Sequence, residues 1–576
     1  MMTLAQSGSA PEYYHAQKII VIHPGSLNLR IGRASDLNPV SVVHAIARRR
    51  KEGGTAFKDS LLPDIQEDEL QEFEEQRLIV SHTIQKFVDT HGDGSKRRRV
   101  ATPPQQISTF NRRSLPEEFP LEITDKVIKP KVQPEQVFDE DIFSCSLDEY
   151  NINFPLRRGQ LNLHHGIGGS LSAVLSDIED IWSHVLRTKL AVDTGTLQQY
   201  SAVLIVPDVY NRSHLKELIS LLLLRMRFKS CFLLQDHVAS TFGAGLGYGC
   251  VLDIGDQKCS ISCVEDGISH PDTRVRLEYG GADVTQVFNT LLKKCCFPYK
   301  ECDYSEYADA LLLTQLKERF CHLNFDICGA QERTFEVKRR DKRIVYTLQL
   351  GDECLVAPLS LLHTELMNIT GRTKMAKVQS RNCNQADSED CYDAEYIRET
   401  GRRNGKDQML EGVLPITGEV ADDDFVGVDA FESEREANIK QSDKDECNFS
   451  NNGQIMPLDQ AIVRSIERCS SDEMKRKMYG CILVVGGGSK FPGFAKLLEK
   501  KVALQFQAIQ QQRPLENYYP QFDVATHTKE MDATMIAWKG AAIMSCLESA
   551  SELWIVVNEW KNFGLRILRE KAPFLW

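Results

Sequence analysis

The chain has 576 residues, of which 42% are hydrophobic, and it carries a formal net charge of −12. This length exceeds what one hydrophobic core normally organises, so we expect at least two lobes and additional segments. The chain contains no run of about 18 apolar residues, which argues against a membrane-spanning helix. Residues 1–17 lack the charged-then-apolar order of a secretory signal, so the sequence predicts a soluble, intracellular protein with no membrane partner.

Most of the negative charge lies in one polar segment. Residues 381–450 contain 19 Asp or Glu and 8 Lys or Arg, which gives this segment a net charge of −11. From about residue 371 to 452 the chain has few aromatic residues and little periodicity, which is typical of a disordered insertion. The 17 cysteines include no Cys-x-x-Cys pair, so reduced core thiols are favoured over disulfides or zinc ligands.

We divide the chain into six segments on these grounds and on the elements described below. They are a flexible N-terminus (1–17), the start of a first lobe (18–50), a partly disordered insertion with a basic cluster (51–150), the core of both lobes (151–370), the acidic disordered insertion (371–452), and a return through the second lobe to the first (453–576).

The first predicted unit is a strand–turn–strand near the N-terminus. Apolar strands at residues 18–23 and 27–33 flank a turn that contains Gly25 and Ser26, with Leu27 directly after them. A phosphate chain is held by backbone N–H groups that can approach it closely, which favours small residues at a turn. We therefore predict that Gly25, Ser26 and Leu27 bind phosphate.

The middle of the chain alternates predicted strands and helices. Apolar positions from Leu171 to Val185 repeat with helical spacing after Ser170, which is a suitable cap, so we predict a core helix at residues 170–188. A second helix is predicted at 213–227. Further strands are predicted at 202–206, 250–254 and 258–264, and this alternation indicates mixed sheets flanked by helices.

A second acidic turn joins the strands at 250–254 and 258–264. It contains Asp253, Ile254, Gly255 and Asp256. A carboxylate repels phosphate directly, but it can order the water shell of magnesium, which keeps several of its waters when bound. We therefore predict that Asp253 and Asp256 hold Mg²⁺ through water, and that this turn contacts the nucleotide phosphates.

A third turn lies near the C-terminus. A buried strand at 481–485 enters Gly486, Gly487 and Gly488 before a helix at 494–504, an arrangement that suits close approach of a base or ribose. Lys317 and Glu318, in the helical stretch 311–323, are candidates for polar contacts there, although such a pair is more often a solvated ion pair. One glycine turn is weak evidence, but three in this order predict a nucleotide site.

With these turns in place, the chain resembles the actin family, and within it most closely the nuclear actin-related proteins of chromatin remodellers. The resemblance implies an α/β fold of the actin-like two-lobed ATPase type, with duplicated mixed sheets flanked by helices and with ATP between the lobes. It covers roughly residues 18–50, 150–365 and 453–576. The segments that carry it beyond the turns are 153–159, 181–182, 204–208, 241–245, 279–285, 317–321, 538–542 and Trp554.

The sequence departs from the actin pattern at the phosphate end. His23 and Pro24 stand where actin has an acidic residue that helps organise the metal and its water, and proline lacks a donor N–H. By its spacing to Phe242, Asp236 matches actin's water-positioning glutamine, and Gln257 replaces a glycine. We predict a retained nucleotide pocket with weakened hydrolysis, and we assign no catalytic residue.

Two basic clusters lie near the first lobe, at residues 48–51 and 96–99. Compact basic runs occur on solvated surfaces, in nuclear import signals and at DNA phosphate contacts, and sequence does not separate these roles. No aromatic residues are interleaved with them, so we expect any DNA contact to be independent of base sequence.

Two functional hypotheses remain. In the first, which we favour, the chain is a nucleus-located, ATP-binding structural subunit. The family resemblance then implies an actin-containing nucleosome-remodelling complex of the inositol-requiring type, active in transcription regulation, DNA repair and recombination. Its implied partners are nuclear actin, another actin-related protein, a long helix of the motor subunit, and nucleosomes or linker DNA. In the second hypothesis, the chain is a catalytic member of the wider superfamily, such as a sugar kinase or a chaperone-type ATPase.

Overall fold

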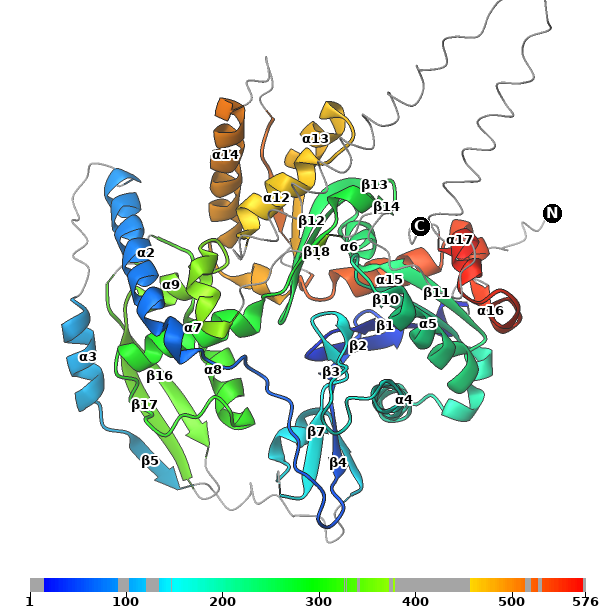
Figure 1. Cartoon of the computed structure of the whole chain (residues 1–576), viewed down its shortest axis with the longest axis horizontal. Coiled ribbons are helices and arrows are strands. Elements are labelled where there is room, and N and C mark those ends of the chain that lie inside the picture. Colours follow the sequence, from blue (N-terminus) through cyan, green and yellow to red (C-terminus); the bar gives the residue numbers. More distant parts are fainter. Residues whose placement is uncertain are drawn as a thin grey trace, which may run out of the picture.

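The computed structural model contains two lobes, each built on its own sheet (Figure 1). It describes residues 15–91, 103–120, 134–146, 148–325, 327, 329–338, 342–371, 377–378, 456–512, 520–526 and 531–572. The basic cluster at 96–99, residues 1–14 of the N-terminus and residues 379–452 of the predicted acidic insertion lie outside these ranges. Among the described helices, none is both long and apolar enough to cross a bilayer.

The first lobe is built on a six-stranded sheet. In spatial order its strands are β21 (Ile555–Val556), β11 (Ser230–Gln235), β10 (Ser201–Val206), β1 (Ile19–Pro24), β2 (Asn28–Arg33) and β3 (Val40–Val43). The three central strands, β1, β10 and β11, are parallel to one another. β2 pairs antiparallel with β1, β3 with β2, and β21 with β11. The helices of this lobe are α4 (Leu171–Thr188), α5 (Arg212–Ser220), α6 (Asp236–Ala244), α15 (Ile536–Ser545), α16 (Val557–Phe563) and α17 (Leu568–Lys571).

Both faces of this sheet are covered, which explains the continuous apolar runs of its strands. Ile20 and Ile22 of β1 belong to the core that α4, α5 and α16 complete, whereas Ile19 and Val21 belong to the core that α6 and α15 complete. Side chains of a strand alternate between its two faces, so four consecutive apolar residues serve two cores.

The second lobe is built on a seven-stranded sheet. Its main path runs β18 (Lys377–Val378), β15 (Val275–Leu277), β13 (Cys259–Glu265), β12 (Tyr248–Ile254), β19 (Ile482–Val485) and β20 (Val524–Thr526), and β14 (Ile268–Ser269) pairs with β13. Its helices are α7 (Gly281–Lys294), α8 (Tyr307–Phe320), α9 (Glu353–Leu359), α12 (Leu458–Glu467), α13 (Asp472–Tyr479) and α14 (Phe494–Gln512).

Helices α6 and α15 lie between the two sheets and carry a common core from one lobe to the other (Figure 1). This cluster contains residues of both sheets, such as Val203 in β10 and Val251 in β12. The two helices cross so closely that a Cβ atom on Gly540 would lie 1.8 Å from the carbonyl oxygen of Ala239. Only glycine permits that approach.

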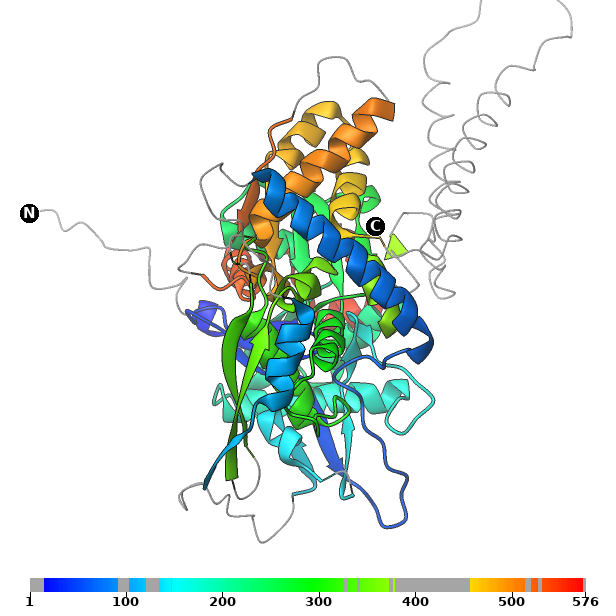
Figure 2. The same cartoon turned by 90° about the vertical axis from the view of Figure 1, so that its left-hand side faces the viewer.

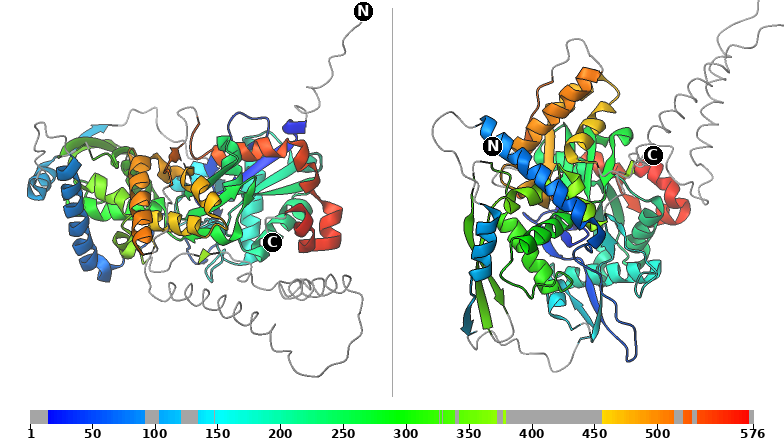
Figure 3. Two further views of the ribbon diagram at one scale, coloured as in Figure 1. Left: turned by 90° about the horizontal axis from the view of Figure 1, so that it is seen from above. Right: turned by 60° about the vertical axis from the view of Figure 1, so that its left-hand side comes forward.

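Residues 51–150, predicted as a partly disordered insertion, are folded over much of their described part. α2 (Leu70–His91) and α3 (Pro104–Arg113) lie on the second lobe, on the side that faces the viewer in Figure 2, and Phe73 of α2 and Ile107 of α3 join its core. Seen from above, they occupy the opposite end of the molecule from α16 and α17 (Figure 3). β5 (Glu117–Pro120) adds an antiparallel strand to β17 (Lys342–Leu350), which pairs with β16 (Gln331–Lys338).

The chain then returns to the first lobe through a small sheet and a hairpin. The sheet has the order β6 (Gln136–Phe138), β4 (Ile46–Arg49) and β7 (Tyr150–Asn153), and the hairpin consists of β8 (Leu156–Arg157) and β9 (Gln160–Leu161).

Most of the predicted core elements are confirmed. The strands expected at 18–23, 27–33, 202–206, 250–254 and 258–264 are β1, β2, β10, β12 and β13, and the helix expected at 170–188 is α4. The helix expected at 213–227 divides into α5 and a π-helical turn at Leu221–Arg225. The described cysteines are free thiols.

Candidate functional site

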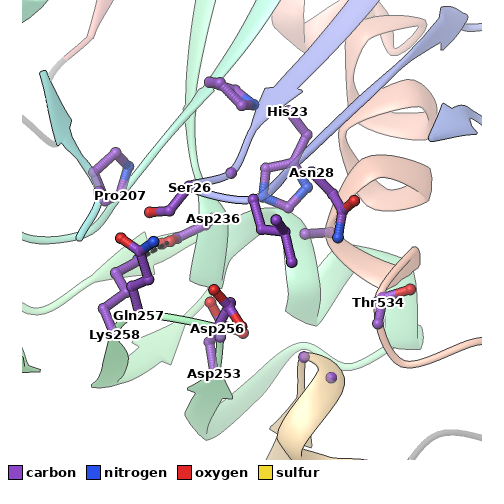
Figure 4. Close-up of a pocket in the computed structure, with 18 of the residues that line it drawn as sticks. His23, Ser26, Asn28, Pro207, Asp236, Asp253, Asp256, Gln257, Lys258 and Thr534 are labelled. Carbon is purple, nitrogen blue, oxygen red and sulfur yellow. Dashed lines mark hydrogen bonds and ion pairs between the residues drawn. The ribbon is translucent and has the colours of Figure 1, made fainter. Parts of the chain in front are cut away.

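A cavity of about 590 Å³ lies between the two lobes, and the three predicted turns border it (Figure 4). Of the predicted site residues, those that line the cavity are Gly25, Ser26, Leu27, Asp253, Gly255, Asp256, Lys317, Glu318, Gly486, Gly487 and Gly488. Ile254 does not line it. Its side chain is fully buried in the core of the second lobe, because it points to the face of β12 opposite its neighbours.

The first two turns are tight hairpins that use their glycine N–H groups internally. The N–H of Gly25 donates to the carbonyl of Asn28 at 2.9 Å, and the N–H of Gly255 donates to the carbonyl of Lys258 at 2.9 Å. A Cβ on Gly25 would lie 2.6 Å from the Asn28 oxygen, so glycine is required for closure of this hairpin. This corrects the expectation that the N–H groups of these glycines face the phosphates.

The donors that remain open in these turns belong to the residues after the glycines. No backbone hydrogen bond in the described part of the chain uses the N–H groups of Ser26, Leu27, Asp256 or Gln257. Two belong to each lobe, so a phosphate chain between the turns meets donors from both sides.

The third turn packs against the second. Gly486 has a φ of 87°, and a Cβ there would lie 2.4 Å from Oδ1 of Asp253, while a Cβ on Gly488 would lie 2.2 Å from the Ile254 side chain. Nothing lies within 4 Å of a Cβ on Gly487. Two of the glycines are therefore needed for packing, and Gly487 leaves open space where a base or ribose was predicted.

Lys317 is a buried cation rather than half of a solvated pair. It is 5% exposed, and its Nζ donates to the carbonyl of Gly281 at 2.9 Å. The start of α7 is fixed to the second turn, because the N–H of Ala282 donates to the carbonyl of Asp256 at 2.8 Å. Burial raises the pKa of Asp256 to about 6, although the Lys317 ammonium opposes this shift.

His23 is uncharged near neutral pH. Burial, followed by the charges of Arg30 and Lys258, lowers its pKa to about 3, and its buried Nδ1 has no hydrogen-bond partner among the described residues. A neutral imidazole cannot replace the acidic residue that organises metal and water in actin.

Asp236, at the water-positioning place, has both carboxylate oxygens engaged. Oδ1 accepts from the backbone N–H groups of Asp208 at 3.1 Å and His237 at 3.0 Å. Oδ2 accepts from Nζ of Lys258 at 3.1 Å. Gln257 is also occupied, because its Oε1 accepts from the N–H of Arg158 at 3.3 Å. Asp236 is therefore held by three donors, and the amide oxygen of Gln257 is engaged.

The cavity carries both signs of charge, and several of these residues were not predicted. The carboxylates that line it are Asp236, Asp253, Asp256, Glu318 and Asp532, and the Lys and Arg side chains are Arg30, Lys258, Lys317 and Lys490. Lys490 pairs with Asp532 at 2.8 Å. Lys258 follows directly after the second turn. This position is the sequence signal from which its place in the cavity could have been predicted.

One group of three buried side chains in the described part of the chain has atoms close enough to share a metal ion: Asp208, Asp236 and His237. Its members already have partners. Oδ2 of Asp208 accepts from the hydroxyl of Ser269 at 2.6 Å, and the two ring nitrogens of His237 lie 2.8 and 3.0 Å from the hydroxyls of Ser262 and Ser260. We interpret this group as a hydrogen-bonded junction between α6 and the second lobe.

Comparisons with known proteins agree with the fold. The family model described as Actin matches residues 15–573. Proteins named Actin-related protein 8 are 54% identical in Aedes aegypti, over 100% of both chains, and 47% identical in Drosophila melanogaster, over 97% of this chain and 95% of the relative. The Bos taurus relative of that name is 39% identical, over 97% and 92%.

A solved structure is also similar to this chain. It is titled "Human actin-related protein Arp8 in its ATP-bound state", and its sequence is 35% identical. The TM-score is 0.78, and the match covers 99% of each chain.

His23 predicts how stability depends on pH. Its folded pKa of about 3 lies below the ordinary value of 6.5, so within this window the unfolded chain takes up a proton that the folded protein does not. The free energy of unfolding therefore falls as pH falls, by about 1.4 kcal/mol per pH unit for this group. Chemical denaturation at several pH values across this window gives the free energy of unfolding as a function of pH. The slope of that plot should be smaller by this amount for His23→Gln than for the wild type. Equal slopes for the variant and the wild type would contradict the assignment.

Proposed function

Since the chain belongs to the actin family, we propose that it is an ATP-binding structural subunit of a nuclear, actin-containing nucleosome-remodelling complex of the inositol-requiring type. The observation that carries the nucleotide part is the cavity between the lobes, where open backbone donors of Ser26 and Leu27 face those of Asp256 and Gln257. The human relative whose title gives an ATP-bound state supports ATP as the nucleotide.

Magnesium fits the charge of this cavity. Its lining contains five carboxylates and four Lys or Arg side chains, so a triphosphate needs additional positive charge. Asp253 and Asp256 both line the cavity and would hold the ion through its water shell, which magnesium retains in large part. When bound, the ion neutralises phosphate charge.

A structural role is favoured over a catalytic one by the groups at the phosphate end. A sugar kinase or chaperone-type ATPase needs a free base or a group that positions the attacking water. Here Asp236 bonds to Lys258 and to two backbone donors, and Gln257 bonds to Arg158. His23 is neutral, so it offers no charge to organise a metal.

The proposed partners are nuclear actin, another actin-related protein, a long helix of the motor subunit, and nucleosomal or linker DNA. This part rests on similarity over nearly the full length to proteins named Actin-related protein 8. Under this proposal the chain acts in the nucleus, in transcription regulation, DNA repair and DNA recombination.

The geometry narrows the candidates for DNA contact within residues 48–51. Arg48 is used internally, because its guanidinium bonds to Asp177 and Asp180, each at 2.6 Å. Arg49 and Lys51 are exposed, and neither has an ion pair with a described residue. Arg50 is only partly exposed and bonds to the carbonyl of Asp148, so Arg49 and Lys51 are the two exposed cations available for phosphate.

The first test concerns the nucleotide. Purified protein should bind Mg-ATP in calorimetry, and its turnover should stay below about one per second, the low end of enzyme rates. Asp256→Asn should weaken binding about tenfold because one carboxylate beside the metal is lost. Asp472→Asn, an exposed change outside the cavity, is the matched control. A wild-type protein that binds no Mg-ATP would refute the nucleotide part of the proposal.

The second test concerns DNA. The protein should bind duplexes of unrelated sequence with similar affinity, and log affinity should fall steeply with log salt. Replacing Arg49 and Lys51 with Gln should reduce that slope by up to about 1.8, because each neutralised phosphate releases about 0.9 counterion. Lys342→Gln, on the second lobe, should not change it. An unaltered slope in the double variant would remove residues 48–51 from the DNA surface and leave the cluster at 96–99.

The third test concerns the complex. Tagged full-length protein recovered from nuclear extract should carry actin, another actin-related protein and a remodeller motor subunit, identified by mass spectrometry. The tag expressed alone is the control. Recovery from nuclei without a motor subunit, or absence from nuclei, would contradict the proposed assembly.

A further inference from the structure

Lys258 is a partly buried cation that lines the cavity. It lies between the second turn and β13, and its side chain is 14% exposed. Its Nζ lies 3.1 Å from Oδ2 of Asp236 and 3.4 Å from the hydroxyl of Ser260. Since an ammonium has three N–H donors, these contacts leave one donor for the cavity, which Lys258 lines.

The β8–β9 hairpin makes room for this side chain. Gly159 in the hairpin has a φ of 73°, a conformation that favours glycine. A Cβ there would lie 3.2 Å from Cδ and 3.3 Å from Cε of Lys258. The stem of Lys258 is therefore confined by the hairpin, and its ammonium is held at a fixed place beside Asp236.

Lys258 lies at the phosphate end of the cavity. Figure 4 shows it beside Gln257 and Asp236, on the side of Ser26 and opposite Thr534. The open backbone donors of Ser26 and Gln257 are at this end, whereas Gly487 and Lys317 border the part predicted to take a base or ribose. A phosphate chain that runs along the two turns thus ends near the Lys258 ammonium.

We propose that Lys258 recognises the terminal phosphate and makes the pocket select a nucleoside triphosphate over a diphosphate. The inference rests on the proposed nucleotide function and deepens it. The third N–H donor of Lys258 meets the terminal phosphate, while Asp236 keeps the ammonium in position. The same contact prevents Asp236 from acting as a base, so the residue that detects the third phosphate also protects it from hydrolysis.

The test compares Mg-ATP and Mg-ADP by calorimetry on the full chain. Lys258→Met keeps the length of the side chain and removes its charge, and it should weaken ATP binding about 10- to 100-fold, the range for a lost charge-assisted hydrogen bond. ADP binding should change less than about threefold, because its last phosphate ends before Lys258. Lys258→Arg should retain most of the preference for ATP.

Two further variants separate recognition from folding. Lys258→Met alone leaves Asp236 buried without its partner, so the double variant Lys258→Met with Asp236→Asn removes both charges and should still lack the preference for ATP. Lys317→Met removes another cation of the cavity, one bonded to the Gly281 carbonyl rather than to Asp236, and should weaken both nucleotides equally.

Each outcome decides the inference. A selective loss of ATP affinity in both Lys258 variants supports it. An equal loss for ATP and ADP, or no loss, overturns it and assigns Lys258 a structural role. Wild-type protein that binds ATP and ADP equally overturns the inference but leaves the proposed function standing. Wild-type protein that binds neither nucleotide overturns both.

Discussion

The contact between α6 and α15 is the constraint on which the rest of the molecule depends. A Cβ on Gly540 would lie 1.8 Å from the Ala239 carbonyl, and one on Gly243 would lie 2.1 Å from the Ile536 carbonyl, so each helix requires glycine where the other crosses it. Because these helices pack against both sheets, the lobes share one core at the point where they meet. This fixed junction lets hairpins from two separate sheets border a single cavity. A looser crossing would separate the donors of Ser26 from those of Gln257.

The same junction determines the electrostatics of the phosphate end. α6 begins at Asp236 and His237, so its first turn lies at the cavity and also reaches β13 of the second lobe through Ser260 and Ser262. Burial opposes protonation of His237, but the carboxylates of Asp208 and Asp236 outweigh it and raise its pKa. Asp236, which lines the cavity, is thereby linked through its neighbour His237 to hydrogen bonds that cross between the lobes.

The sequence predicted what local patterns determine. The hairpins at Gly25 and Gly255 were predictable because apolar strands flank a small turn, and α4 was predictable from its apolar stripe and Ser170 cap. Four features were missed. Phe73 of α2 reaches the core of the second lobe from a segment without a clear pattern. Gly25 uses its N–H to close its own hairpin. Ile254 faces the core because the register of β12 turns its side chain away from those of its neighbours. The pairing of Lys258 with Asp236 joins residues on different lobes, which no spacing rule reveals.

These features together suit a pocket that holds a nucleotide rather than one that consumes it. The open donors come from both lobes, so a bound triphosphate bridges them and adds to the junction that α6 and α15 already make. A ligand that binds only the folded state stabilises it by about 4 kcal/mol when its concentration is a thousand times its dissociation constant. That gain persists only while the nucleotide stays intact. Under the proposed function, the ion pair between Lys258 and Asp236 disfavours the use of Asp236 to orient water, and the bridging ligand then stays intact. Under the proposed function, slow hydrolysis is therefore what allows ATP to act as a permanent structural element between the lobes.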